Sequence, residues 1–218
     1  MRKFILLLFF CSWFTVYAWA SPNDSISTVY RDGEFRSYCQ MSVNASDSIS
    51  NAVISKFVYQ MCYDLDGLFK WGLKGMLSDK GKKDILYFDF KRTSYDKKTT
   101  VLRASGDIIV PGITTLPNLY IDSKLSQKAH ANGRRDVRLD LCSHNPFLKK
   151  MDGVCSYIPK GNNRTGFYTL ETHIKFGWFF DIFITQNRYK QILEWRLKRL
   201  VYNIRLEAEK EQKMNAEK

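Results

Sequence analysis

The stretch that decides the fold is TQNRYKQILEWRLKRLVYNIRLEAEKEQ, residues 185–212. Its apolar side chains recur at steps of three and four, and most of the positions between them are charged. This period predicts a long amphipathic α-helix with one face that must be covered. The apolar face comprises Tyr189, Ile192, Leu193, Leu197, Leu200, Val201 and Ile204. A helix of this length needs a broad apolar partner, which the preceding sequence must supply.

Segments that alternate between apolar and polar residues precede this helix, and they predict strands with one dry face. The predicted strands cover residues 29–43, 86–91, 99–110, 137–142, 154–158 and 168–176. A turn at residues 95–98 should join the second and third of them as a hairpin. Residues 111–132 are irregular by contrast, because two prolines interrupt any long element there, and only Leu119–Ile121 could form a short strand.

Two short helices are predicted between the first strand and the others. Ser50 can cap a helix over residues 51–63, and a second helix should cover residues 68–77. The one-sided strands suit an antiparallel sheet that is covered on one face, and the long closing helix is the natural cover. We therefore predict an α+β fold.

The N-terminus has the features of a signal peptide. Arg2 and Lys3 precede an uncharged apolar stretch that ends in Ala18-Trp19-Ala20, the pattern that signal peptidase cleaves. We expect residues 1–20 to be removed and the protein to be secreted or periplasmic; an uncleaved anchor is the alternative. Residues 21–28 are predicted to be a flexible leader, residues 29–212 a single domain, and residues 213–218 a charged tail.

The chain is strongly basic, with a formal net charge of +12. In an exported protein such a charge favours an anionic partner such as a membrane or another envelope surface, or it serves solubility alone. The lysines and arginines are scattered instead of clustered on one helix, which argues against nucleic-acid binding. We expect a monomer.

Four cysteines remain once Cys11 leaves with the signal peptide, and an even number in an exported chain predicts two disulfides. These four are Cys39, Cys62, Cys142 and Cys155. The last two are the favoured pair because two predicted strands joined by a turn carry them, and the first two would then form the other bridge. Buried free thiols are the alternative. Neither a C-x-x-C nor an H-x-x-x-H spacing occurs, so we predict no metal site.

The chemistry-bearing residues form no recognisable catalytic set. His130, His144 and His173 have no obvious partner in the sequence, and a G-x-S-x-G motif is missing. Glycine-rich phosphate loops are missing too. We therefore predict no catalytic residue and no cofactor.

The order of these elements resembles the START-like, helix-grip superfamily, which includes the major birch pollen allergen and polyketide cyclase-like proteins. The resemblance covers roughly residues 29–210 and rests on topology and patterning. It implies a curved sheet wrapped around the C-terminal helix, with two short helices near the N-terminus and an apolar cavity inside. The ligand-binding residues that it implies are Leu86, Phe88, Phe90, Leu139, Tyr168, Leu170, Phe176, Leu193, Leu197 and Val201.

Three functions are consistent with this architecture. The first is an exported protein that binds a hydrophobic or amphipathic, lipid-like small molecule in its cavity without chemistry. The second is an enzyme of the same scaffold, cyclase- or hydrolase-like. The third is an envelope-associated interaction protein, in which the same apolar residues simply fill a core.

Overall fold

The computed structural model describes residues 24–76, 87–110, 114–143, 148–178 and 185–217. Within these residues, eight strands form one antiparallel sheet in the order β1-β2-β8-β7-β6-β5-β4-β3. The strands are β1 (Ser25–Arg31), β2 (Glu34–Val43), β3 (Tyr87–Asp96), β4 (Val101–Val110), β5 (Thr114–Ala129), β6 (Arg135–Leu141), β7 (Leu148–Pro159) and β8 (Gly166–Phe176). The helices are α2 (Asp47–Tyr63), α3 (Leu65–Lys70) and α5 (Gln186–Ala216).

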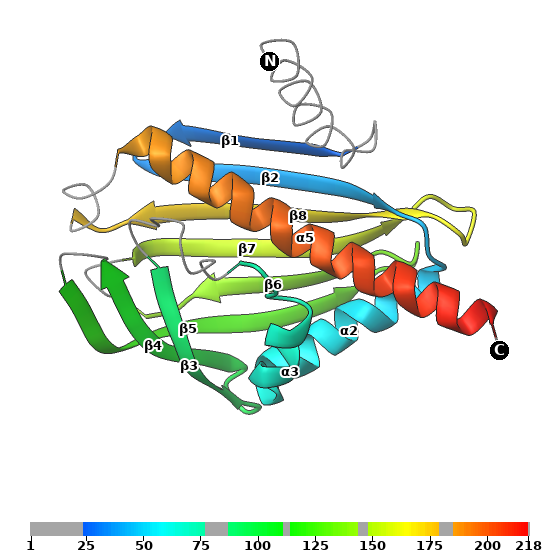
Figure 1. Ribbon diagram of the computed structural model, residues 1–218, viewed down its shortest axis with the longest axis horizontal. Coiled ribbons are helices and arrows are strands. Elements are labelled where there is room, and N and C mark those ends of the chain that lie inside the picture. The colour runs from blue at the N-terminus through cyan, green and yellow to red at the C-terminus, as the bar shows by residue number, and fades with distance from the viewer. Residues whose placement is uncertain (1–23, 77–86, 111–113, 144–147, 179–184, 218) are drawn as a thin grey trace, which may run out of the picture.

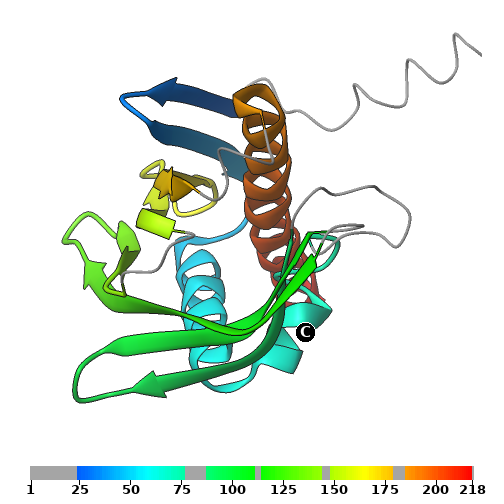
Figure 2. The same ribbon diagram turned by 90° about the vertical axis from the view of Figure 1, so that its left-hand side faces the viewer.

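The sheet curves around the helices, as the two ribbon views show together (Figures 1 and 2). Helix α5 crosses the concave face, and α2 and α3 lie beside it over the strands of the other end. The predicted α+β fold class is therefore confirmed: a curved antiparallel sheet wraps around a long C-terminal helix, with two shorter helices near the N-terminus.

Strand β1 extends the sheet into the segment that we expected to be a flexible leader. Residues 25–28 belong to it, and the register pairs Ser25 with Gln40 of β2. The turn between the two strands is Asp32-Gly33, and both residues have positive φ, 55° and 74°. Because this Asp-Gly pair favours a tight hairpin turn, the single extended segment predicted over residues 29–43 is in fact two strands.

Strand β5 is the main correction to the predicted elements, because we expected residues 111–132 to be irregular. Ladder pairs flank the predicted breaker: Leu116 faces Ile108, and Leu119 faces Gly106. Pro117 and Asn118 therefore stand against a single residue, Asp107, and form a β-bulge. The proline needs no ladder hydrogen bond there, and the Asp107 carboxylate accepts the Asn118 N–H at 3.0 Å.

The N-terminal helices begin earlier than predicted. Ser46, and not Ser50, caps α2, since its hydroxyl accepts the Ile49 N–H. Asp64 caps α3 by accepting the Gly67 N–H at 2.9 Å. Each cap is a short polar side chain that satisfies a free N–H at a helix start.

Helix α5 runs to Ala216, beyond the predicted end at Gln212. Its last third packs against the start of α2, where the Gln212 side chain accepts the Ser46 N–H at 2.9 Å. Glu207 is also buried, and it lies 2.6 Å from the Lys56 ammonium of α2. These contacts hold the highly charged end of α5 against α2.

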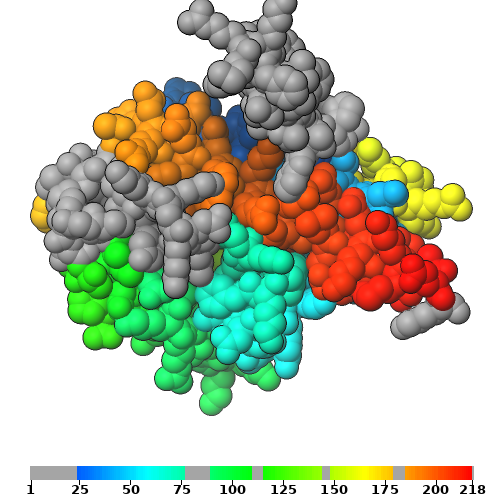
Figure 3. Space-filling model, viewed as in Figure 1, coloured from blue at the N-terminus to red at the C-terminus, as the bar shows by residue number. Residues whose placement is uncertain are grey.

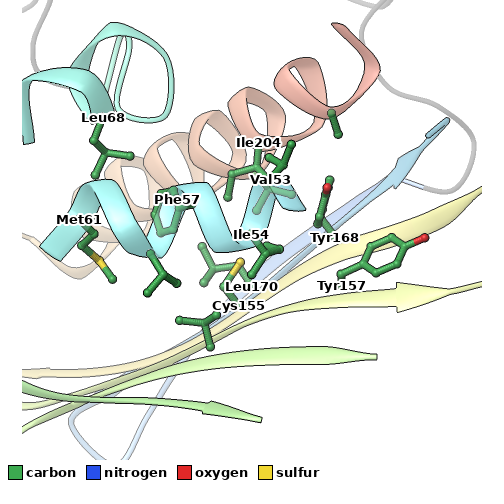
Figure 4. Packing of buried hydrophobic residues seen from close by; sticks show 14 of the residues in the cluster. Val53, Ile54, Phe57, Met61, Leu68, Cys155, Tyr157, Tyr168, Leu170 and Ile204 are labelled. Atoms are coloured by element: carbon green, nitrogen blue, oxygen red, sulfur yellow. The ribbon is translucent and has the colours of Figure 1, made fainter. Parts of the chain in front are cut away.

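The densest part of the core lies where α2 and α5 meet strands β2, β7 and β8. Several side chains there are fully buried: Val53, Ile54, Tyr157, Tyr168, Val201 and Ile204 (Figure 4 shows most of them). The Tyr168 hydroxyl donates to the Ser50 carbonyl at 3.0 Å, so this aromatic side chain satisfies its polar end while filling the core. None of the described helices is long and apolar enough to span a membrane.

Candidate ligand cavity

A cavity of about 350 Å³ lies between the concave face of the sheet and the helices. Strands β3 to β8 form its floor, and Phe57 and Met61 of α2 lie over it together with Leu68 of α3. Leu197 and Leu200 of α5 close another side. The volume falls at the lower end of the range of small-molecule sites, about 300–1,000 Å³.

Residue size explains why this region is hollow. On β7 and β8 the inward pair Tyr157 and Tyr168 fills the space beneath α2. Two inward pairs further along the same strands, the facing residues are Gly153 and Thr172. A Cβ added to Gly153 would meet its nearest atom, the Thr172 Cγ2, at 3.6 Å, which is ordinary contact. Ala104 of β4 is a further small residue of the wall. The small side chains at these facing positions leave a void, whereas side chains as large as tyrosine at the same positions would fill it.

Hydrogen bonds from α5 hold the turn after α3 in place beside the cavity. Asn203 of α5 is buried, and its side-chain amide donates to the carbonyls of Gly72 and Lys74, at 2.9 Å each. Arg199 donates to the same Lys74 carbonyl at 3.2 Å. The turn after α3 is thereby held against α5, and Figure 3 shows the α3 region and α5 in contact on this face of the molecule. Leu73 of this turn is part of the cavity lining.

Of the ten residues implied as ligand-binding, four line the cavity: Phe90, Leu139, Leu170 and Leu197. Four others lie elsewhere in the structure. Tyr168 and Val201 belong to the filled core, Phe176 stacks on Tyr189 with ring centroids 4.3 Å apart, and Leu193 is partly buried on α5 outside the lining. Leu86 lies outside the described residues, and of Phe88 only the backbone is described.

Sequence reasoning missed the part of the lining that α2, α3 and the following turn supply. Phe57 and Met61 lay on the apolar face of a predicted helix, so that face was a usable signal. Leu65, Leu68 and Leu73 lay in or beside a helix placed a few residues too late. Gly153 gave no signal, because a glycine in a strand has no side chain that a periodicity could register.

The described lining carries hydroxyls but no cation. Thr93, Ser123 and Thr172 are its hydroxyl residues, and Asp152 is its only ionisable residue besides Cys155. The Asp152 carboxylate contacts Lys150 at 3.5 Å and His173 at 3.3 Å, and both of those side chains belong to the convex face. No described acid or base side chain therefore projects into the cavity as a charged group.

The four cysteines are free thiols in the structure, so neither predicted disulfide is formed. For Cys142 and Cys155 the strand register gives the reason: Cys155 faces Val137, five positions before Cys142. At about 3.3 Å per residue that offset far exceeds the separation that a disulfide spans. Burial raises the pKa of Cys155 to about 12, and that of Cys62 to about 11, so both thiols stay protonated.

The described histidines lie on the convex face or at its end, away from the cavity. His173 sits among three carboxylates, and its Nε2 lies 3.3 Å from Glu171. His130 contacts Asp136 at 2.8 Å, and His144 lies outside the described residues. No described serine or cysteine nucleophile contacts either imidazole, and no described cluster of His, Cys, Asp or Glu side chains is placed to hold a metal ion.

A second, polar groove of about 530 Å³ lies on the convex face. The outward side chains of β2 and β5 to β8 line it, including Tyr38, Lys128, Asp136 and Glu171. Burial opposes ionisation of Asp136, but hydrogen bonds from Arg134, Ser156 and His130 outweigh it and lower the pKa of this carboxyl. Its charge is thus satisfied within the protein.

The fold is START-like. The strand order, the curvature of the sheet and the position of α5 carry this assignment. No family model matches the sequence, and no curated protein matches it either.

Several solved structures are similar to the chain. The STAR-related lipid transfer protein from Xanthomonas axonopodis matches with 12% sequence identity and a TM-score of 0.48, over 88% of this chain and 96% of that one. The lipid transfer and protein localization domain of human StarD13 matches with 10% identity and a TM-score of 0.49, over 86% of each chain. The ZhuI aromatase/cyclase from Streptomyces sp. R1128 matches with 10% identity and a TM-score of 0.45, over 88% of this chain and 96% of that one.

Proposed function

We propose that the protein binds a hydrophobic or amphipathic, lipid-like small molecule in this cavity and performs no chemistry on it. The observation that carries the proposal is the cavity itself, about 350 Å³ with a predominantly aliphatic and aromatic lining. Apolar surface inside a protein stabilises an apolar ligand by removing it from water. The solved structures reported above include two whose names refer to lipid transfer, which agrees with this class of ligand.

The other two functions have weaker support. An enzyme of this scaffold would need at least two titratable groups within hydrogen-bonding reach in the cavity. Among the described lining residues the Asp152 carboxylate contacts convex-face partners, and Cys155 keeps its proton. An interaction protein with a filled core would have no void of this size.

We also propose that the protein is exported, is a monomer and approaches anionic surfaces. The support for export is the signal-like sequence of residues 1–20, and the support for the surface is the net charge of +12. Fractionation of the native host with an antibody against the protein tests export, because retention in the cytoplasm contradicts it.

Gly153 offers a direct test of the cavity. The Gly153→Leu variant should fill the void without backbone strain, because this glycine has no positive φ and an added Cβ would make only ordinary contact, at 3.6 Å, with the Thr172 Cγ2. Wild-type protein purified from its own host should carry a bound small molecule in native mass spectrometry, and the variant should not. With N-phenyl-1-naphthylamine as a fluorescent probe, the variant should bind at least about tenfold more weakly.

Val154→Leu is the matched control. Val154 is the next residue of β7 but lines the convex groove, so its enlargement leaves the cavity unchanged. Circular dichroism and thermal unfolding establish that both variants are folded. Ligand-free wild-type protein with no probe uptake, or equal probe uptake by the Gly153→Leu variant, would contradict the proposed function.

A further inference from the structure

The cavity wall contains a hydroxyl that has no hydrogen-bond partner among the described groups. It is Oγ1 of Thr172, which is buried although its residue borders the void. The methyl Cγ2 of the same side chain lies on the side of Gly153. A ~120° rotation about the Cα–Cβ bond can bring the hydroxyl to the position that the methyl now occupies, beside Gly153 of the cavity lining, while the methyl moves to the third staggered position. A buried hydroxyl without a partner is unfavourable, so a ligand that satisfies it gains affinity.

The charge around the void restricts the ligand further. The described lining contains no lysine, arginine or histidine. An anionic head group placed inside would lose its hydration without meeting a counterion, and burying an unpaired charge is costly. The nearest described lysine on β7, Lys150, directs its ammonium to Glu34 at 3.1 Å and to Asp152 at 3.5 Å on the convex face. The chain's positive charge therefore does not extend to the described cavity wall.

We propose that the cavity selects an uncharged amphiphile, such as a long-chain alcohol, and that Thr172 hydrogen-bonds to its single polar group. This inference rests on the proposed function, because it specifies the ligand of the same cavity. The apolar part of the molecule lies along Leu170 and Leu139, which belong to the same wall. A threonine hydroxyl both donates and accepts, so it suits a hydroxyl or a carbonyl oxygen.

Decan-1-ol and decanoate are suitable probes, because they share a chain length and differ in charge. Displacement of N-phenyl-1-naphthylamine from the wild-type protein at pH 8 should show that decan-1-ol binds at least about tenfold more tightly than decanoate. Decanoate should gain affinity as the pH falls toward 4.5, since protonation of its carboxyl removes the charge, while decan-1-ol should change little. Equal affinities at pH 8 would overturn the inference and leave the proposed function intact. Displacement of the dye by neither compound would contradict the proposed function itself.

Thr172→Val and Thr172→Ser separate the hydroxyl from the shape of the wall. Valine keeps the volume and removes the hydroxyl, so decan-1-ol should bind about fivefold more weakly, whereas serine should retain the affinity. Decane has no polar group, and the valine variant should bind it at least as well as the wild type does. If the valine variant binds decan-1-ol as tightly as the wild type does, the proposed hydrogen bond from Thr172 to the ligand is wrong. Thr169→Val on the convex face controls for the substitution of a strand threonine.

Discussion

The two halves of the space between helices and sheet differ although the same strands run through both. In the filled half, around Tyr157 and Tyr168, the side chains under α2 are fully buried and leave no room. In the hollow half, around Gly153 and Thr172, the same two strands border a cavity. The alternation of inward and outward residues is identical in both halves. The difference therefore shows that residue size at inward positions, and not the apolar pattern, decides whether this fold has a core or a ligand site.

Truncation of a side chain in the filled half should have the largest effect. Tyr168→Ala removes a fully buried ring from a packed region and should cost about 3–5 kcal/mol in the free energy of unfolding. Phe90→Ala, in the cavity wall, should cost less, about 1–2 kcal/mol, because this side chain borders the cavity and is only partly buried. Urea unfolding followed by circular dichroism measures both. Equal losses would mean that the two halves are packed alike.

The second-largest expected difference between the two halves is in the reactivity of their cysteine thiols. Burial is the first cause of the raised pKa of both Cys39 and Cys155, each to about 12, so their thiolate fractions at pH 8 are alike. Cys155 borders the cavity, whereas Cys39 is fully buried on β2. A small neutral reagent, methyl methanethiosulfonate, should modify Cys155 at least about tenfold faster in variants that retain only one of the two. Decan-1-ol should protect Cys155 alone; similar rates at the two thiols would contradict a reachable cavity.

The ion pairs that join α2 to α5 in the filled half should have the smallest effect. Lys56 contacts Glu207 at 2.6 Å and Glu211 at 2.9 Å, but its side chain is 38% exposed, so Lys56→Met should cost less than about 1 kcal/mol. Burial lowers the pKa of Lys56, but the hydrogen bonds to the two glutamates outweigh it and raise the pKa above the ordinary 10.5.

The pH dependence of this effect follows from the sign of the shift. A raised pKa in the folded state means that the contribution is complete below pH 10.5 and is lost as the pH rises through the folded value. Thermal unfolding at pH 8 and pH 11.5 should therefore show a smaller difference between wild type and Lys56→Met at the higher pH. Lys128→Met, on exposed β5, is the control, and an equal difference at the two pH values would exclude the ion pairs as its cause.

The fold could be predicted because the spacing of apolar residues along the sequence indicates its main helix and several of its strands. The helix over residues 185–212 and the strands over residues 137–142 and 168–176 each show one apolar face, and the structure pairs those faces. Strand β5 could not be predicted in the same way, because its bulge at Pro117 depends on a partner strand. Strand β1 begins in a polar segment whose order comes from pairing with β2.

The residues of the candidate site were harder to predict from the sequence than the fold was. Periodicity identifies the inward face of a strand, and Phe90, Leu139 and Leu170 were found in this way. It does not reveal whether the space opposite is occupied, so Tyr168 and Val201 were included although they fill the core. The position of the void depends on which inward residues happen to meet across strands and helices, and that information is three-dimensional.

The arrangement of β2 and β8 has a consequence for how the chain is made. These neighbouring strands come from opposite ends of the sequence, and the hydrogen bond from Tyr168 to Ser50 joins residues 118 positions apart. During translation the first helices must wait for β8, and then for Val201 and Ile204 of α5, before their apolar faces are covered. A fold dominated by such distant contacts should form slowly for its size. Until the last residues leave the ribosome, the unfinished chain should be a client for chaperones.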